Sequence, residues 1–198
     1  MPSVRNPRGF VEYRHLGGAA RPATRTYRVK ADHGHNQLFA GDPVVLVSGD
    51  CVIRTVAGTT ASLPILGVVR SVLNSNKRPF THSAPSGGAF IPASTAGFAE
   101  VNIDPFQTYL VDCDATVVST NVGQYVDITA GTPNTAAGRS GMSIKIASAV
   151  NTVSANTVPF QIVAIGDDNL DGLVGGENNQ DVEVIISNHV FTNRNKAR

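Results

Sequence analysis

The sequence predicts an all-β fold, in which an extended N-terminal arm precedes a β-sandwich or β-barrel body. Short runs rich in Val, Ile and Thr recur at spacings of roughly 8–15 residues, and Gly, Asn and Pro turns separate them. The segment 41–53 reads as turn, strand, turn and strand, with Ser48-Gly49-Asp50 as its hairpin signal. No segment keeps a convincing helical period over three turns, so helix should be minor.

The composition supports this fold class and limits the function. The chain has 198 residues, which suits one large β domain or two small ones. Only 16% of the residues are charged, and 16 basic residues face 15 acidic ones, so no global field directs the chain to nucleic acid or to a membrane. We find no apolar run of membrane-spanning length and no signal peptide, and therefore expect synthesis in a cytoplasm.

Residues 1–25 are predicted to form the arm, because they are basic and their few apolar residues show no period. Prolines and Gly17-Gly18 interrupt any regular element, which is typical of a segment that is disordered when free and orders on a partner. A floppy terminus without a contact role is the alternative. The candidate contact residues in the arm are Arg5, Arg8, Phe10, Arg14, Leu16, Arg21 and Arg25.

The body is predicted to span residues 26–191, followed by a basic tail over 192–198. Its first half should hold strands at 26–30, 44–47, 51–56 and 65–73, the last of which is apolar enough to be buried on both faces. The segment 74–97 is rich in Ser, Pro, Gly and Asn and reads as a long loop that could divide the body into two subdomains. It carries Phe80 and Phe90, which we include among the candidate partner contacts.

The second half of the body repeats the pattern of short strands and turns. The expected strands lie at 98–103, 107–112, 116–118, 124–129, 143–149, 160–165 and 182–187.

Few residues of the sequence suggest a catalytic or metal-binding site. The run Asp167-Asp168-Asn169-Leu170-Asp171-Gly172 matches the opening of a calcium loop, with Asp167, Asn169 and Asp171 as oxygen ligands. Asn178 stands where the closing carboxylate should be, so a solvated turn is the alternative. The histidines at 33 and 35 lack a second cluster of metal ligands, and Ser140 does not lie in a nucleophile elbow. We expect no enzymatic activity and no cofactor other than this calcium ion.

The charges are unevenly distributed along the chain. Residues 1–30 carry seven basic side chains and one acidic one, whereas residues 165–185 carry six acidic side chains and no basic one. Opposed patches of this kind favour contacts between copies of the chain, although accidental clustering at solvated ends would produce the same pattern.

Several short motifs, in this order, resemble the head-decoration or cement proteins of tailed bacteriophages. They are Gly9-Phe10, Leu16-Gly17-Gly18, Gly41-Asp42-Pro43-Val44, Ile65-Leu66-Gly67-Val68-Val69, Glu100-Val101-Asn102-Ile103-Asp104-Pro105-Phe106, Tyr109-Leu110-Val111, Gly138-Arg139-Ser140-Gly141 and Val184-Ile185-Ile186-Ser187-Asn188-His189. The resemblance spans most of residues 9–191, and each motif is short.

The resemblance implies a homo-oligomeric protein of the virion exterior that binds the major capsid protein and bridges shell subunits. It implies no catalytic residues, and no nucleic acid or membrane as partner. Two other functions stay open, namely another virion module of the tail or fibre, and a small β-sandwich module that binds carbohydrate or calcium. A carbohydrate site would call for exposed aromatic residues, whereas only 6% of this chain is aromatic and Trp is absent.

Overall fold

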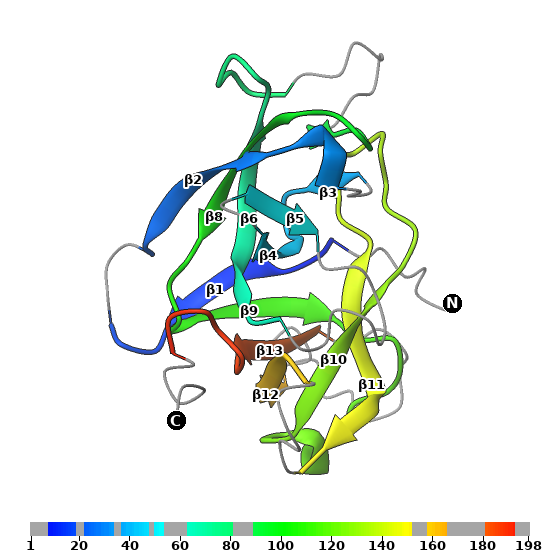
Figure 1. The fold of residues 1–198 in the computed structure, drawn as a ribbon. Coiled ribbons are helices and arrows are strands. Elements are labelled where there is room, and N and C mark those ends of the chain that lie inside the picture. The colour runs from blue at the N-terminus through cyan, green and yellow to red at the C-terminus, as the bar shows by residue number, and fades with distance from the viewer. Residues whose placement is uncertain are drawn as a thin grey trace.

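The computed structural model describes residues 8–18, 22–33, 37–47, 50–53, 63–80, 89–151, 158–165 and 181–192. Within these ranges the chain is nearly all β (Figure 1), which confirms the predicted fold class. The helical elements of these ranges are two short 3-10 turns, η1 (Ala31–His33) and η2 (Ser119–Asn121). No helix in the described part of the chain is long and apolar enough to cross a membrane.

Five strands form a closed barrel. They are β2 (Thr24–Val29), β4 (Pro43–Val47), β5 (Asp50–Ile53), β6 (Ile65–Leu73) and β8 (Gly97–Asn102), in the order β2-β5-β4-β6-β8. The predicted hairpin is confirmed, because β4 and β5 pair antiparallel with Val47 opposite Asp50. A parallel pair between β2 and β5 closes the barrel. Next to it lies a small sheet of β3 (Leu38–Phe39) and β7 (Phe90–Ile91).

Six strands form an antiparallel sheet in the order β1-β9-β13-β12-β10-β11. Their bounds are β1 (Val11–His15), β9 (Gln107–Asp112), β10 (Tyr125–Ala130), β11 (Met142–Val150), β12 (Phe160–Ile165) and β13 (Asp181–Ile186). The sheet curls back on itself, because a bridge between Cys113 and Ile144 brings β11 next to the end of β9. There the Asp114 N–H donates to the Ile144 carbonyl at 2.9 Å.

The barrel is inserted between the first and second strands of the sheet, since all five of its strands lie between β1 and β9 in the chain. A division of the body within 74–97 is therefore wrong, because β6 and β8 flank this segment and pair with each other in the barrel. The chain passes from barrel to sheet at residues 103–106 instead. Figure 1 shows the barrel above the sheet, with β1 between them.

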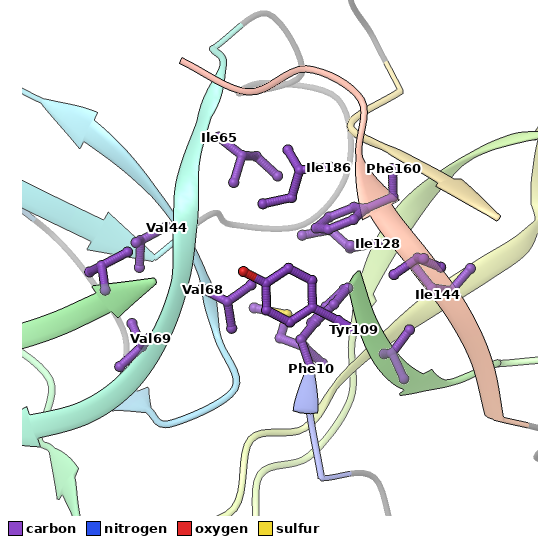
Figure 2. Packing of buried hydrophobic residues seen from close by; sticks show 14 of the residues in the cluster. Phe10, Val44, Ile65, Val68, Val69, Tyr109, Ile128, Ile144, Phe160 and Ile186 are labelled. Atoms are coloured by element: carbon purple, nitrogen blue, oxygen red, sulfur yellow. The ribbon is translucent and has the colours of Figure 1, made fainter. Parts of the chain in front are cut away.

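One hydrophobic core joins the two parts. Figure 2 shows barrel residues such as Ile65 and Val68 facing Tyr109, Phe160 and Ile186 of the sheet. All five are buried. Because burying an apolar side chain of this size stabilises a fold by about 1.5–3 kcal/mol, the shared core holds barrel and sheet together as one body.

Most predicted strands are confirmed, but the strand expected at 116–118 is wrong. Val117 is buried and Val118 is exposed, and the chain turns into η2 directly afterwards. The sequence also failed to predict β1, β3 and β7. Of these β1 matters most, because it lies inside the segment that we expected to be a disordered arm.

Candidate interaction surface and buried junctions

The described parts of the predicted arm, residues 8–18 and 22–25, belong to the folded body, and the second of them runs into β2. Phe10 is 3% exposed. Its ring stacks on Phe160 with a centroid distance of 4.6 Å and meets Tyr109 edge-on at 6.4 Å (Figure 2). The expectation that Phe10 lies outside the core and anchors the arm on a partner is therefore wrong. A buried aromatic side chain with two ring partners stabilises its own chain.

The arginines at the start of the chain pair with the late acidic residues of the same chain. Arg8 forms an ion pair with Asp181. Arg14 reaches across β9 to bind both carboxylate oxygens of Glu183, and its Nε lies 2.6 Å from Oε1. The expectation that these opposed charges link neighbouring copies is wrong for these two pairs. The other acidic residues of 165–185 lie outside the described residues.

Glu183 is almost completely buried, with 1% of its side chain exposed. Burial by itself would raise the pKa of this carboxyl. Hydrogen bonds from Arg14 and Thr108 and the charge of Arg14 outweigh burial and hold the pKa of Glu183 below its ordinary value. The ion pair between Arg14 and Glu183 therefore keeps a charged carboxylate within the sheet and ties β1 to β13.

The remaining predicted contact residues have different environments. Phe90 is 6% exposed and stacks on Phe39 with a centroid distance of 5.0 Å, and Phe80 is half-buried and packs against the core. Phe90 is therefore buried and wrong as an exposed contact, whereas the half-buried Phe80 stays a predicted contact. Arg25 is exposed on the barrel strand β2, with its guanidinium carbon 5.6 Å from the centre of the Tyr27 ring. Arg5 and Arg21 lie outside the described residues.

Leu16 is exposed, as predicted, and it belongs to a larger set of exposed apolar side chains on or next to β1. We call this set the β1 patch; its members and exposed fractions are Val11 40%, Tyr13 41%, Leu16 53% and Phe106 54%. The Leu16 N–H donates to the Phe106 carbonyl at 3.0 Å, which joins the loop after β1 to the loop before β9. Sequence reasoning missed the other three residues, although the alternation of Val11 and Tyr13 was a visible strand signal.

A groove of about 270 Å³ runs along β1 where this strand meets the barrel. Val11 and Glu12 line one wall, and Val68, Val69 and Arg70 of β6 line the other. The Arg70 Nε lies 3.9 Å from the Glu12 Oε2, so the charged groups of the two walls face each other. The groove is therefore lined mainly by apolar side chains, and the ion pair between Arg70 and Glu12 lies along it.

Two buried titratable side chains join the barrel to the sheet. The first is Asp42, which is 2% exposed. Its Oδ2 accepts a hydrogen bond from the Phe39 N–H at 2.8 Å, and the Ser140 hydroxyl donates to its Oδ1. Ser140 Oγ in turn accepts from the Met142 N–H at 3.0 Å. Burial raises the pKa of Asp42 to about 7, although both hydrogen bonds oppose this rise.

The second is His189, which follows β13 and is fully buried. The Ile65 N–H donates to the Asn188 carbonyl at 2.8 Å and the Val190 N–H donates to the Ile65 carbonyl at 2.9 Å, so this segment pairs with the start of β6. The His189 Nδ1 accepts from the Phe191 N–H at 3.1 Å, which leaves the proton of the neutral ring on Nε2. Nε2 has no hydrogen-bond partner among the described residues. Burial lowers the pKa of His189 to about 4, against the effect of the Asp104 charge.

The predicted calcium ligands Asp167, Asn169 and Asp171 lie outside the described residues. The residues that the structure does describe contain no group of three or more His, Cys, Asp or Glu side chains that could hold a metal ion.

Comparison of the chain with protein-family models, with curated proteins and with solved structures finds no match.

Proposed function

We propose that this chain is a virion structural protein that binds the outer surface of a phage capsid and bridges shell subunits, without enzymatic activity. Its partners are the major capsid protein and further copies of itself. The ordered motifs of the sequence and the all-β body support this proposal. The observation that carries it is the β1 patch, where four apolar side chains are 40–54% exposed on or beside an edge strand.

The physical argument concerns where binding energy would come from. Exposed ion pairs contribute only about 0–1 kcal/mol each, and Arg8 and Arg14 are already paired within the chain. Apolar side chains must therefore supply most of the binding energy. Weak contacts that are repeated over a capsid lattice add up to strong binding through multivalency. The single core shared by barrel and sheet provides a rigid body, which a protein that bridges shell subunits needs.

The test is co-sedimentation of the protein with empty capsids. The double variant Tyr13→Ser/Leu16→Ser should bind at least tenfold more weakly, a loss of about 1.4 kcal/mol, and melt at the same temperature as the natural chain. Val118→Ser is the matched control, because Val118 is 47% exposed and precedes η2, outside the β1 patch. It should bind like the natural chain. Equal binding by the double variant would remove the β1 patch from the interface.

A second measurement tests the stabilising role. Capsids that carry the protein should survive heat or osmotic shock better than stripped capsids. If both survive equally, the protein decorates the shell without reinforcing it.

Tyr13 and Phe106 also keep the carbohydrate-binding alternative open, because exposed aromatic rings can stack on sugars. Glycan binding in the absence of capsid binding would replace the proposal.

A further inference from the structure

The outer side of the barrel carries an aromatic ring beside exposed cations. Phe98 of β8 lies directly opposite Arg28 of β2 and also opposite Leu73 of β6. The three strands lie side by side in Figure 1. Residues opposite each other on neighbouring strands share a side of the sheet, and the next residues along, Val29 and Ala99, are fully buried. Arg28, Phe98 and Leu73 therefore lie on the outer side of the barrel.

Lys77 lies over the Phe98 ring, with its Nζ 5.3 Å from the ring centre. A tight turn over residues 74–78 holds it there. The Lys77 N–H donates to the Asn74 carbonyl at 2.9 Å, and the Asn74 N–H donates to the Arg78 carbonyl at 2.8 Å. The Asn74 Oδ1 also accepts from the Arg78 N–H at 3.1 Å. These bonds fix the backbone from which Lys77 and Arg78 project.

The backbone of Lys77 has a conformation that is uncommon for a lysine. Its φ is +59°, in the left-handed region that glycine and asparagine adopt most easily. Residues held in such conformations concentrate at functional sites. Because glycine would suit this turn better, the turn itself gives no reason for a lysine, and its charge over the Phe98 ring calls for another explanation.

Exposed cations outnumber exposed acids on this part of the molecule. Among the described side chains of residues 22–102, the exposed acid is Asp32 and the exposed cations are Arg25, Arg28, Arg70, Lys77 and Arg78. Arg28, Lys77 and Arg78 form no ion pair with any described residue. We call these three cations, together with Phe98, the basic barrel face.

The composition of the basic barrel face fits a protein partner that supplies carboxylates. Aromatic residues and arginine are enriched in protein interfaces, and a guanidinium group can donate two parallel hydrogen bonds to one carboxylate. Nucleic acid fits less well, because binding to a phosphate backbone typically uses about 6–10 cationic contacts. Two acids also border this face, namely Glu100, two residues after Phe98, and Asp50, next to Arg28 in β5.

A second copy of this chain is a poor partner for the same face. Among the described side chains the exposed acids are Asp32 and Asp114, and the Asp114 Oδ1 already accepts from the Ile146 N–H at 2.8 Å. The other acids with described side chains are buried or half-buried. The charge complementarity that the face needs therefore has to come from a different protein.

We propose that the basic barrel face is a docking surface for an acidic peptide segment of another protein. The carboxylates of this segment pair with Arg28, Lys77 and Arg78, and the segment covers the Phe98 ring. Exposed ion pairs are individually weak and are screened by salt, so the complex is weak and depends on ionic strength. This inference does not depend on the proposed function, because the face shares no residue with the β1 patch.

The first test is an NMR titration of the full natural chain with hexaglutamate. The Lys77 and Phe98 amide signals should shift until the face is saturated, whereas the Ile162 amide signal of β12 should not shift. Raising the salt concentration from about 20 to about 200 mM should weaken binding at least about fivefold, because salt screens exposed charges. No shift at Lys77 and Phe98, or an equal shift at Ile162, would overturn the proposal.

The second test uses Lys77→Gln/Arg78→Gln, which should melt at the same temperature as the natural chain and bind hexaglutamate at least about tenfold more weakly. The matched control is Arg139→Gln/Lys145→Gln, which also removes one exposed arginine and one exposed lysine, from the loop before β11 and from β11. The control should bind like the natural chain. Equal weakening by the two double variants would mean that only the net charge matters, which overturns the docking surface.

The class of partner is tested with the same variants. Hexathymidylate, a single-stranded oligonucleotide of similar charge, should bind more weakly than hexaglutamate, and tighter binding would make nucleic acid the partner instead. In sedimentation, Lys77→Gln/Arg78→Gln should keep the oligomeric state of the natural chain. A change of oligomeric state in this variant alone would mean that a second copy occupies the face.

Discussion

The barrel and the sheet meet at two junctions, each of which contains one buried titratable side chain. Burial shifts the pKa of that side chain upward at one junction and downward at the other. The N-terminal junction holds Phe10, Asp42 and Ser140, and both carboxyl oxygens of Asp42 have hydrogen-bond partners. The C-terminal junction holds Ile65 and His189, and only one ring nitrogen of His189 has a partner among the described residues. Burial favours the neutral form of both groups, which raises the pKa of Asp42 to about 7 and lowers that of His189 to about 4.

The consequence is that the two junctions respond to pH with opposite signs. The contribution of Asp42 is lost as the pH rises through 7. His189 has its pKa lowered from 6.5, so its contribution is present above 6.5 and is lost as the pH falls through 4. The two effects partly cancel between about pH 4 and 6.5. The pH dependence of stability in the natural chain would therefore underestimate the contributions of Asp42 and His189. Single-site variants are needed to separate the two contributions.

The largest expected effect comes from breaking the N-terminal junction with Phe10→Ala. Removing a buried ring that stacks on Phe160 should lower the free energy of unfolding by about 3–5 kcal/mol, measured by urea denaturation. The control is Leu16→Ala, which removes an exposed side chain six residues later and should change stability by no more than about 0.5 kcal/mol. Equal effects of the two variants would place Phe10 outside the core.

The C-terminal junction can be isolated with His189→Asn. The Asn amide oxygen can still accept from the Phe191 N–H, but the side chain cannot titrate. Between pH 6.5 and 4 the natural chain should lose up to about 3 kcal/mol more stability than the variant, because its imidazole must take up a proton while buried. Urea denaturation at the two pH values measures this difference. Equal losses of stability in the natural chain and in His189→Asn would contradict the conclusion that His189 is buried in its neutral form.

Arg14 and Glu183 link the two junctions, since β1 follows the first and β13 precedes the second. Arg14→Ala leaves the buried Glu183 carboxylate without its cation. We expect a loss of about 1–3 kcal/mol at pH 7, below the full cost of a buried pair because the Arg14 side chain is 53% exposed.

The pH dependence and a double variant sharpen this prediction. The pKa of Glu183 is held low, so its contribution is present above 4.5 and is lost as the pH falls through its folded value. Arg14→Ala should lose most of this acid dependence. Arg14→Ala/Glu183→Gln should recover part of the stability, which a thermodynamic cycle measures. Strict additivity of the two substitutions would mean that the pair does not interact.

The smallest expected effect is that of Arg8→Ala. Arg8 is 41% exposed where it pairs with Asp181, so the loss in the free energy of unfolding should be below about 1 kcal/mol. The loss should shrink further in roughly 0.5–1 M salt, because salt at that concentration screens surface charges. A larger loss that salt does not reduce would mean that Arg8 acts through packing at the N-terminal junction.

Sequence patterns predicted the body well, because its strands are apolar runs bounded by turn residues. β6, β9 and β13 each form such a run and lie at the expected positions. β1 was missed because Val11-Glu12-Tyr13-Arg14-His15 carries two charges and a histidine, and its partners are far away in the chain. Arg14 and Glu183 are 169 residues apart, so no local pattern indicates that they pair.

The junctions were harder still to predict. Gly41-Asp42-Pro43 was interpreted as a turn, and it is one. That Asp42 is buried depends on Gly9 and Ser140, which pack against this turn from distant parts of the chain. Similarly, Phe10 follows a glycine in a charged segment, and nothing nearby signals that Phe160 will meet its ring.

The insertion of the barrel between β1 and β9 fixes an order of events during synthesis. Every barrel strand has been synthesised once residue 102 is added, whereas β1 must wait for β9, and Phe10 must wait for Phe160. The barrel can therefore close while the first strand of the chain is still unpaired and its phenylalanine still faces water. Such an exposed segment is prone to aggregate, so the nascent protein is most vulnerable in the interval before the last third of the chain is made.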